Sequence, residues 1–131
     1  MKSSRGLSSI GDVAHKFGLD THVLRHWESV GLLSPARDSA DRRLYSESDI
    51  VRVAVIVRNK AAGMSLLQIA VLLDADSYQR HKILAGHIAD LDHRMEEMRL
   101  SREMTYHSLH CEQHDIVNCP RFRASLEDLL V

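Results

Sequence analysis

Hydrophobic residues recur at helical spacing in two short segments near the start of the chain. The first segment begins after Ser9, whose hydroxyl is suited to cap a helix, and ends at Gly18. The second begins after Asp20, another candidate cap, and ends at Gly31. Two helices joined by a glycine-containing turn predict a helix-turn-helix. The apolar positions are Ile10, Val13, Ala14 and Phe17 in the first helix and Val23, Leu24 and Trp27 in the second.

The next part of the chain is rich in turn-forming residues and then returns to helical patterning. Residues 35–41 predict a loop, and residues 42–45 predict a short extended segment. Two capping boxes follow, one from Ser46 to Asp49 and one from Ser65 to Gln68. They predict helices that end near Ala62 and Leu73. The expected buried positions are Ile50, Val53, Ala54 and Val57 in the first of these helices and Leu66, Ile69, Ala70 and Leu73 in the second.

The longest predicted helix runs from Ser77 to about Leu109, a stretch without proline. Positions 84, 88, 91, 95, 98, 102, 105 and 109 alternate in steps of four and three, which is a heptad seam. Such a helix is roughly 50 Å long, more than a small head can cover. We therefore expect a partner helix, most simply from a second copy of the chain. The alternative is a long helix that folds back on its own domain.

After Leu109 the pattern changes, and we expect Pro120 to end regular structure and residues 121–130 to form a short amphipathic helix. No apolar run approaches the roughly twenty residues that span a membrane, and the N-terminus lacks the apolar stretch of a signal peptide. These features predict a cytoplasmic protein with no membrane partner. In that compartment two cysteines, Cys111 and Cys119, are not by default a structural disulfide.

Charge is unevenly distributed, although the net charge is only −1. The first 62 residues hold ten Lys/Arg against seven Asp/Glu, whereas the remainder hold seven against eleven. Within the basic part, an Arg-His-Trp triplet at residues 25–27 and the pair Arg42 and Arg43 lie on separate small elements. Two cationic elements of this kind suit a grip on a nucleic-acid backbone at two places.

The order of these motifs resembles one known family. The chain reads SSIGDVA, LRHWESVGLL, SPAR, RRLYSESDI and GMSLLQIAVLL in succession over residues 8–73, followed by the heptad seam. This order resembles the MerR family of bacterial transcriptional regulators, in the short form that has no large C-terminal ligand domain. One departure is that His26 and Trp27 stand where the commonest family pattern has two tyrosines.

The resemblance implies a mainly α fold with a winged helix-turn-helix head, a long antiparallel dimerisation helix and a short C-terminal tail. On this basis we expect a DNA-binding domain at residues 1–75, a coiled-coil dimerisation helix at 76–109 and a Cys/His-containing tail at 110–131. The implied partners are double-stranded promoter DNA, a second copy of the chain and, indirectly through the promoter, RNA polymerase.

Several side chains are candidates for DNA contact. Thr21 and His22 lie in the first turn of the second helix, where a recognition helix meets base edges. Arg25 lies one turn further on, and the resemblance makes it a DNA contact; the alternative is an ion pair with Glu28 or Glu47. The full candidate set is Ser9, Thr21, His22, Arg25, His26, Arg42, Arg43 and Tyr45.

The remaining candidates are assigned by chemistry and by the resemblance. Ser9 presents a hydroxyl at a helix N-terminus, which favours an anion, and His26 can donate to a phosphate. The resemblance places Arg42 and Arg43 on the wing, where they grip the DNA backbone. The Tyr45 hydroxyl can reach a phosphate while its ring packs on the head.

A second cluster lies at the end of the long helix. It comprises His107, His110, Cys111, His114 and Cys119. Thiolates with imidazoles suit a thiophilic metal ion or a metallo-cofactor. Two other interpretations fit the same residues: a redox switch in which Cys111 and Cys119 form a disulfide, and a structural role in which both cysteines pack the tail.

The expected function is therefore a sequence-specific transcriptional regulator that acts as a homodimer and distorts promoter DNA in response to an effector. The alternative is an architectural or excisionase-like winged-helix protein without a ligand-controlled switch. A protein-interaction module that uses only the long helix would leave the basic wing without a role. The sequence shows no phosphate-binding glycine loop, no nucleophile elbow and no pair of carboxylates in a predicted cleft, so we do not expect an enzyme.

Overall fold

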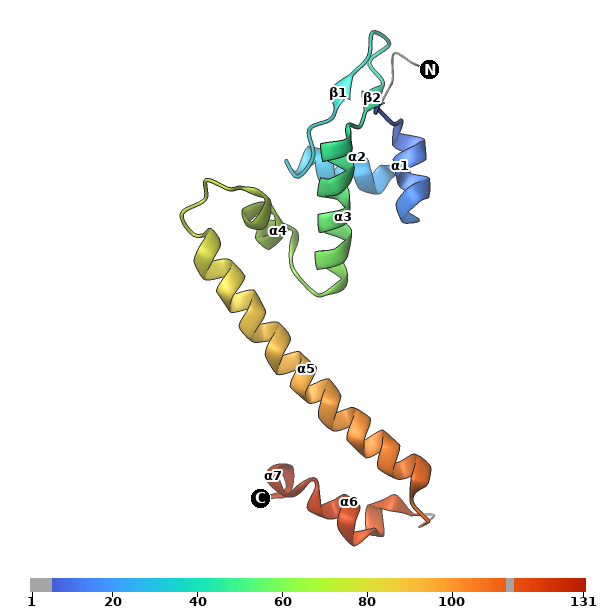
Figure 1. Ribbon diagram of the computed structural model, residues 1–131, viewed down its shortest axis with the longest axis vertical. Helices are drawn as coiled ribbons and strands as arrows, with labels where there is room; N and C mark the ends of the chain where they lie inside the picture. Colours follow the sequence, from blue (N-terminus) through green and yellow to red (C-terminus); the bar gives the residue numbers. More distant parts are fainter. Residues whose placement is uncertain (1–5, 113–114) are drawn as a thin grey trace. The chain divides into compact units, whose positions relative to one another are not determined.

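The computed structural model describes residues 6–112 and 115–131, and these form two compact units, one through His87 and one from Ile88. The first unit contains helices α1 (Ile10–Phe17) and α2 (Thr21–Ser29), strands β1 (Ala36–Arg37) and β2 (Arg43–Leu44), and helices α3 (Glu47–Ala61) and α4 (Leu66–Leu73) (Figure 1). Helix α5 (Arg80–His110) begins in the first unit and continues into the second. The second unit also contains the 3₁₀ helix η2 (Ile116–Asn118) and helices α6 (Pro120–Ala124) and α7 (Glu127–Leu130). The mainly α fold with a winged head and a long helix is confirmed.

Local capping explains where most helices of the head begin. The Ser9 hydroxyl accepts a hydrogen bond from the Asp12 backbone N–H at 3.1 Å. Both predicted capping boxes are confirmed, at residues 46–49 and 65–68. Asp20 occupies the N-cap position of α2, as expected, but among the described residues its side chain makes no capping hydrogen bond. It lies instead near the His22 ring, at 4.0 Å.

One core links the helices of the head to its wing. Leu24 and Trp27 of α2 are buried, as expected, with Tyr45 and Ile69 from later elements. The expectation for α3 was partly wrong: Ala54 is exposed, whereas Ile56 is fully buried. Helix α3 packs against both α1 and α4, so its buried face is centred on Val53 and Ile56 and is displaced from the single stripe that the sequence predicted.

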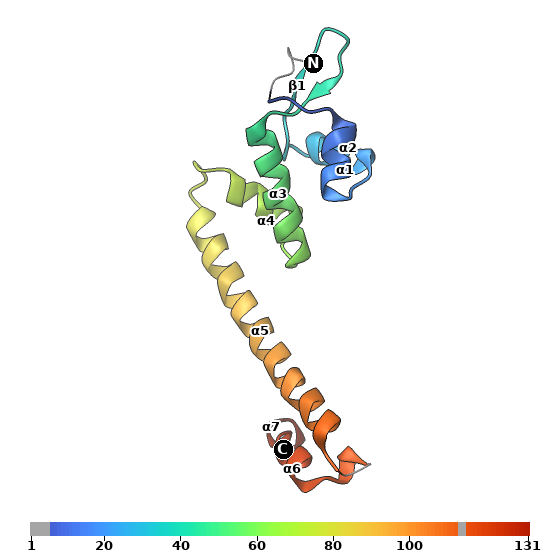
Figure 2. The ribbon, with the colours of Figure 1, turned by 45° about the vertical axis from the view of Figure 1, so that its right-hand side comes forward.

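The wing is a two-stranded antiparallel hairpin in which Ala36 pairs with Leu44 and Arg37 pairs with Arg43 (Figure 2). The chain before α1 joins it, because Ser8 and Tyr45 exchange two backbone hydrogen bonds of 2.8 Å each. These bonds hold the start of α1 beside the base of the wing. The hairpin is therefore tied to the head by backbone pairing as well as by side chains.

The tail of the second unit departs from the prediction. Pro120 does not end regular structure but is the first residue of α6. At this position the backbone N–H has no partner within a helix, so a proline, which lacks the N–H, is tolerated. The predicted helix at residues 121–130 is divided, since α6 ends at Ala124 and α7 begins at Glu127. Phe122 and Cys119 are the buried hydrophobic residues of this unit within the described residues. They pack the tail beside the end of α5.

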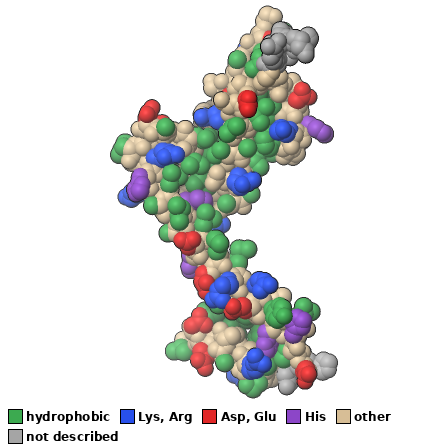
Figure 3. Space-filling view, viewed as in Figure 1, with side chains coloured by type: hydrophobic (Ala, Val, Ile, Leu, Met, Phe, Trp, Pro, Cys, Tyr) green, Lys and Arg blue, Asp and Glu red, His purple; other side chains and the backbone are tan. Residues whose placement is uncertain are grey.

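Apolar side chains remain uncovered in both units. No described residue of α5 is buried in the single chain, and Ile88, Met95, Met98 and Leu109 of the heptad seam are exposed. On the face shown in Figure 3, hydrophobic side chains also gather over α3 and α4. Within the described residues, no helix is both long and apolar enough to cross a membrane.

Candidate DNA-binding surface and cysteine cluster

Helix α2 presents its polar face outward because Leu24 and Trp27 hold its other face in the core. His22, Arg25 and His26 are exposed on the outer face, and Thr21 is half-buried in the first turn. The Arg25 guanidinium donates a hydrogen bond to the Thr21 hydroxyl at 3.1 Å. The ion pair considered above, with Glu28 or Glu47, is therefore not the contact that Arg25 makes. Its guanidinium lies along the first turn of α2, beside Thr21.

The carboxylate of Glu28 connects α2 to the wing. Glu28 accepts a hydrogen bond from Arg43 Nε at 2.5 Å through one oxygen and from Arg37 Nη2 at 3.2 Å through the other. The hydrogen bond from Arg43 is the main reason that the pKa of Glu28 lies below its ordinary value. The spacing of these residues in the sequence does not predict the contacts, but the pairing of the two strands does. Arg37 and Arg43 are directly opposite, so their like charges lie on one face of the hairpin, and a carboxylate between them offsets the repulsion.

Arg42 is oriented differently from Arg43. Its side chain is 78% exposed and pairs with the Asp38 carboxylate at 3.0 Å. Asp38 also accepts from the backbone N–H groups of Arg42 and Ala40, and the Arg42 N–H is the main cause of the lowered pKa of Asp38. The carboxylate thus shapes the wing tip and leaves the Arg42 guanidinium at the surface.

Tyr45 is fully buried, in contrast to the exposed polar residues of α2. Its hydroxyl has no hydrogen-bond partner among the described residues, and burial raises the pKa of the phenol. In this structure the ring packs in the head, and the hydroxyl is not at the surface where a phosphate would meet it. Ser9 is exposed, but its hydroxyl oxygen already accepts the capping bond from Asp12.

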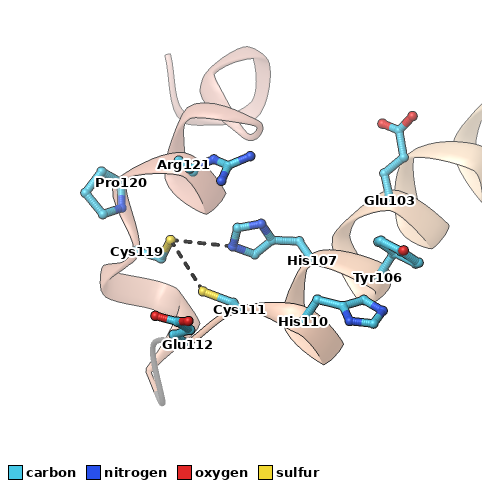
Figure 4. A pocket seen from close by; sticks show the side chains of 9 residues that line it. All are labelled: Glu103, Tyr106, His107, His110, Cys111, Glu112, Cys119, Pro120 and Arg121. Carbon is cyan, nitrogen blue, oxygen red and sulfur yellow. Dashed lines mark hydrogen bonds between the residues drawn. The ribbon is translucent and has the colours of Figure 1, made fainter.

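Three of the five clustered Cys and His residues come together at the end of α5 (Figure 4). Cys119 Sγ lies 3.5 Å from His107 Nε2 and 3.9 Å from Cys111 Sγ. One donor atom from each residue lies within 4.8 Å of the others. His110 is exposed and packs its ring on Tyr106, with centroids 4.4 Å apart, and does not join the three. His114 lies outside the described residues.

Local structure explains this meeting. His107 and Cys111 are one helical turn apart, and the Cys111 backbone N–H donates to the His107 carbonyl at 2.8 Å. Cys119 returns to them because η2 and the start of α6 reverse the chain. We call the set His107, Cys111 and Cys119 the cysteine–histidine cluster. It borders an open pocket of about 700 Å³ that Arg121 and Glu112 also line.

The pKa of the Cys119 thiol lies below its ordinary value, although this residue is only 4% exposed. The backbone N–H of Phe122 is the main cause of the lowered pKa of Cys119, and the Arg121 N–H and the Cys111 thiol act in the same direction against burial. Two cysteine sulfurs beside an imidazole form a donor set that thiophilic metal ions prefer.

The winged helix-turn-helix with an exposed basic surface defines a DNA-binding protein, and comparison with known proteins gives its family. Residues 8–76 match the MerR HTH family regulatory protein, and residues 50–104 match the family "MerR, DNA binding". The chain belongs to the MerR family. It is a DNA-binding transcriptional regulator and not an enzyme.

Individual relatives match over most of the chain. A probable heavy metal-dependent transcriptional regulator of Haemophilus influenzae is 33% identical over 119 residues, which cover 85% of this chain and 93% of the relative. An uncharacterized HTH-type transcriptional regulator of Pseudomonas aeruginosa is 31% identical over 120 residues, with 86% and 91% covered.

Solved structures agree on the fold. The regulator PbrR691 from Ralstonia metallidurans, in complex with lead(II), is 29% identical with a TM-score of 0.54, covering 89% of this chain and 98% of that one. HiNmlR, a MerR family regulator lacking the sensor domain and bound to promoter DNA, has a TM-score of 0.68 at 20% identity, with 79% and 87% covered.

Proposed function

We propose that this protein is a metal-responsive member of its family, in which the cysteine–histidine cluster binds a thiophilic cation and so changes how the protein holds promoter DNA. The observation that carries the proposal is the convergence of Cys119, Cys111 and His107 within 4.8 Å. The sulfurs are 3.9 Å apart, well beyond the roughly 2.05 Å of a disulfide. A relative named as heavy metal-dependent and a related regulator solved with lead(II) support the same class of effector.

The protein acts on DNA as a homodimer in this proposal. The exposed heptad seam of α5 needs a partner, and a second copy supplies a complementary seam. Residues 1–75 then serve as the DNA-binding domain, 76–109 as the antiparallel dimerisation helix and 110–131 as the sensing segment. RNA polymerase is affected indirectly, through the altered promoter, and the protein works in the cytoplasm, where its DNA is.

Within the DNA-binding domain, the proposed contacts divide by exposure. Thr21, His22 and Arg25 face base edges from α2, whereas Arg42 meets the backbone from the wing. His26 and Ser9, which are both exposed, serve as backbone contacts in this proposal. Arg43 sets the position of the wing through Glu28 and would contact a phosphate only by exchanging that carboxylate for it. Tyr45 supports the wing from the core.

The experiment compares the response of two variants to metal. DNA sites are first selected from a random library with the purified, reduced protein. DNA untwisting and transcription are then measured on a promoter that carries the selected site, with and without Cu⁺ or Zn²⁺. Cys119→Ser removes a cluster donor, and His110→Ala is the matched control, because His110 lies one residue before Cys111 but outside the cluster.

We expect metal to change promoter geometry and transcription with the wild-type protein and with His110→Ala, but not with Cys119→Ser, whose DNA affinity without metal stays the same. A response that survives in Cys119→Ser would contradict the proposal. A response to a hydroperoxide but not to metal, with loss of two thiols per chain, would support the redox-switch interpretation instead. No response to either would leave the cysteines with a packing role.

A further inference from the structure

The position of His107 distinguishes a three-ligand site from a pair of thiolates. Its Nε2 atom lies closer to Cys119 Sγ, at 3.5 Å, than the Cys111 sulfur does, at 3.9 Å. His107 is half-buried on α5, and its ring packs on Phe122 with centroids 5.7 Å apart. Figure 4 shows the imidazole and both sulfurs directed toward one point. The ring is therefore held with its Nε2 atom toward the sulfurs before any ion arrives.

The spacing of the donors can be compared with the spacing that each coordination geometry requires. With metal–sulfur bonds of about 2.3 Å and metal–nitrogen bonds of about 2.0 Å, a trigonal ion sets the two sulfurs about 4.0 Å apart and each sulfur about 3.7 Å from the nitrogen. A tetrahedral ion sets these distances at about 3.8 Å and about 3.5 Å. A linear ion between two thiolates separates the sulfurs by about 4.6 Å. The observed 3.9 Å between the sulfurs and 3.5 Å between Cys119 Sγ and His107 Nε2 are closer to the values for three or four ligands than to that for a linear pair. Cys111 Sγ lies within 4.8 Å of the donor nitrogen of His107, and these two atoms would lie about 3.5–3.7 Å apart in the bound site.

We propose that His107 Nε2 is a third ligand, so that the cation is held by two thiolates and one imidazole. The site would then take a thiophilic cation that accepts three or more ligands, such as Cu⁺ in a trigonal arrangement or Zn²⁺ with one position left for solvent. This inference rests on the proposed function only in taking the cluster as the metal site. It assigns His107 the role of setting the coordination number, and through it the affinity.

His110 supplies an internal comparison. It is a second histidine near the same sulfurs, but it is exposed and stacked on Tyr106. If any nearby imidazole could complete the site, His110 would compensate for the loss of His107. The geometry indicates that it cannot, because among the described residues only His107 joins the two sulfurs within 4.8 Å.

The experiment uses the full-length, reduced, metal-free protein and Cu⁺ and Zn²⁺ as separate probes. His107→Phe keeps a ring against Phe122 but removes the donor nitrogen, and His110→Phe is the matched control. The affinity for each ion is measured by competition with a chelator, and the Cu⁺ coordination is measured by X-ray absorption. DNA binding by each metal-free variant verifies that the head is folded.

We expect wild type and His110→Phe to show two sulfur ligands and one nitrogen ligand on Cu⁺, and His107→Phe to show sulfur ligands alone. We expect His107→Phe to bind both ions at least about tenfold more weakly, since even the loss of an outer-shell partner costs 10- to 100-fold. Two-sulfur coordination in wild type, with unchanged affinity in His107→Phe, would overturn the role of His107 and leave the proposed function intact. Failure of wild type to bind either ion would overturn both.

Discussion

The pairing of Glu28 with two wing arginines can be tested by removing one charge. Glu28→Gln keeps the shape of the side chain and one acceptor oxygen but abolishes both ion pairs. Side-chain exposures of 22% for Arg43, 25% for Glu28 and 34% for Arg37 place these pairs between surface and core. Exposed pairs contribute about 0.2–1 kcal/mol each, and hydrogen bonds to charged groups about 1.5–3 kcal/mol. We therefore expect a loss of about 1–2 kcal/mol in the free energy of unfolding.

The pH dependence of this loss identifies its origin. Because the pKa of Glu28 in the folded protein lies below its ordinary value of 4.5, its contribution is complete above that pH. The contribution is lost as the pH falls through the lowered pKa. Urea unfolding of wild type and Glu28→Gln should thus differ fully at pH 7 and converge in acid.

A control separates this pairing from the general effect of losing a carboxylate. Glu47 is exposed in the first turn of α3, and Glu47→Gln should cost only roughly 0.3 kcal/mol through the helix dipole. Equal unfolding curves for wild type and Glu28→Gln at pH 7 would refute the reasoning. A difference that persists unchanged in acid would do so as well, since the charge would then not be its cause.

Three further expectations concern DNA, the core and the dimer. Arg25→Ala should weaken binding to the selected site by about 1–3 kcal/mol in a gel-shift titration, and an unchanged affinity would remove Arg25 from the base contacts. Ile56→Ala should lower the free energy of unfolding in urea by about 2–5 kcal/mol; Leu67→Ala, at a side chain 82% exposed, should change it little. Met98→Glu should shift the protein toward monomer in sedimentation experiments, because it places a charge on the heptad seam; an unchanged dimer would mean that the seam is not the interface.

The sequence predicted the elements whose causes are local. Serine caps at Ser9, Ser46 and Ser65 act within a few residues of themselves, and each was confirmed. Asp20 has the same sequence signature, but its carboxylate lies near His22, so a capping residue type did not ensure a capping bond. The role of Pro120 could not be predicted from its residue type either. A proline ends a helix when it lies in the interior and begins one when it occupies the first helical position, as Pro120 does in α6.

The contacts that sequence did not predict join residues far apart in the chain. Ile56 is buried because α3 packs against two other helices, and one periodic stripe does not reveal the second neighbour. Glu28 meets Arg43 across fifteen positions, which requires the hairpin to be placed first. For the proposed metal site, the sequence offered five candidate Cys and His residues. The return of the chain before α6 places Cys119 beside His107 and Cys111. His110, on the same helix as His107, instead packs its ring on Tyr106.

The register of the hairpin also explains how the cations of the wing divide their roles. Arg37 and Arg43 are directly opposite, so both side chains leave the same face of the ribbon and meet Glu28. Arg42 lies just before β2, and its side chain is 78% exposed and pairs with Asp38 instead of Glu28. Only one face of a two-stranded ribbon can lie against the head, and the contacts with Glu28 show that it is the face that carries Arg37 and Arg43. A one-residue shift in register would exchange these roles, and the pairing of Ser8 with Tyr45 at the base of the hairpin prevents that shift.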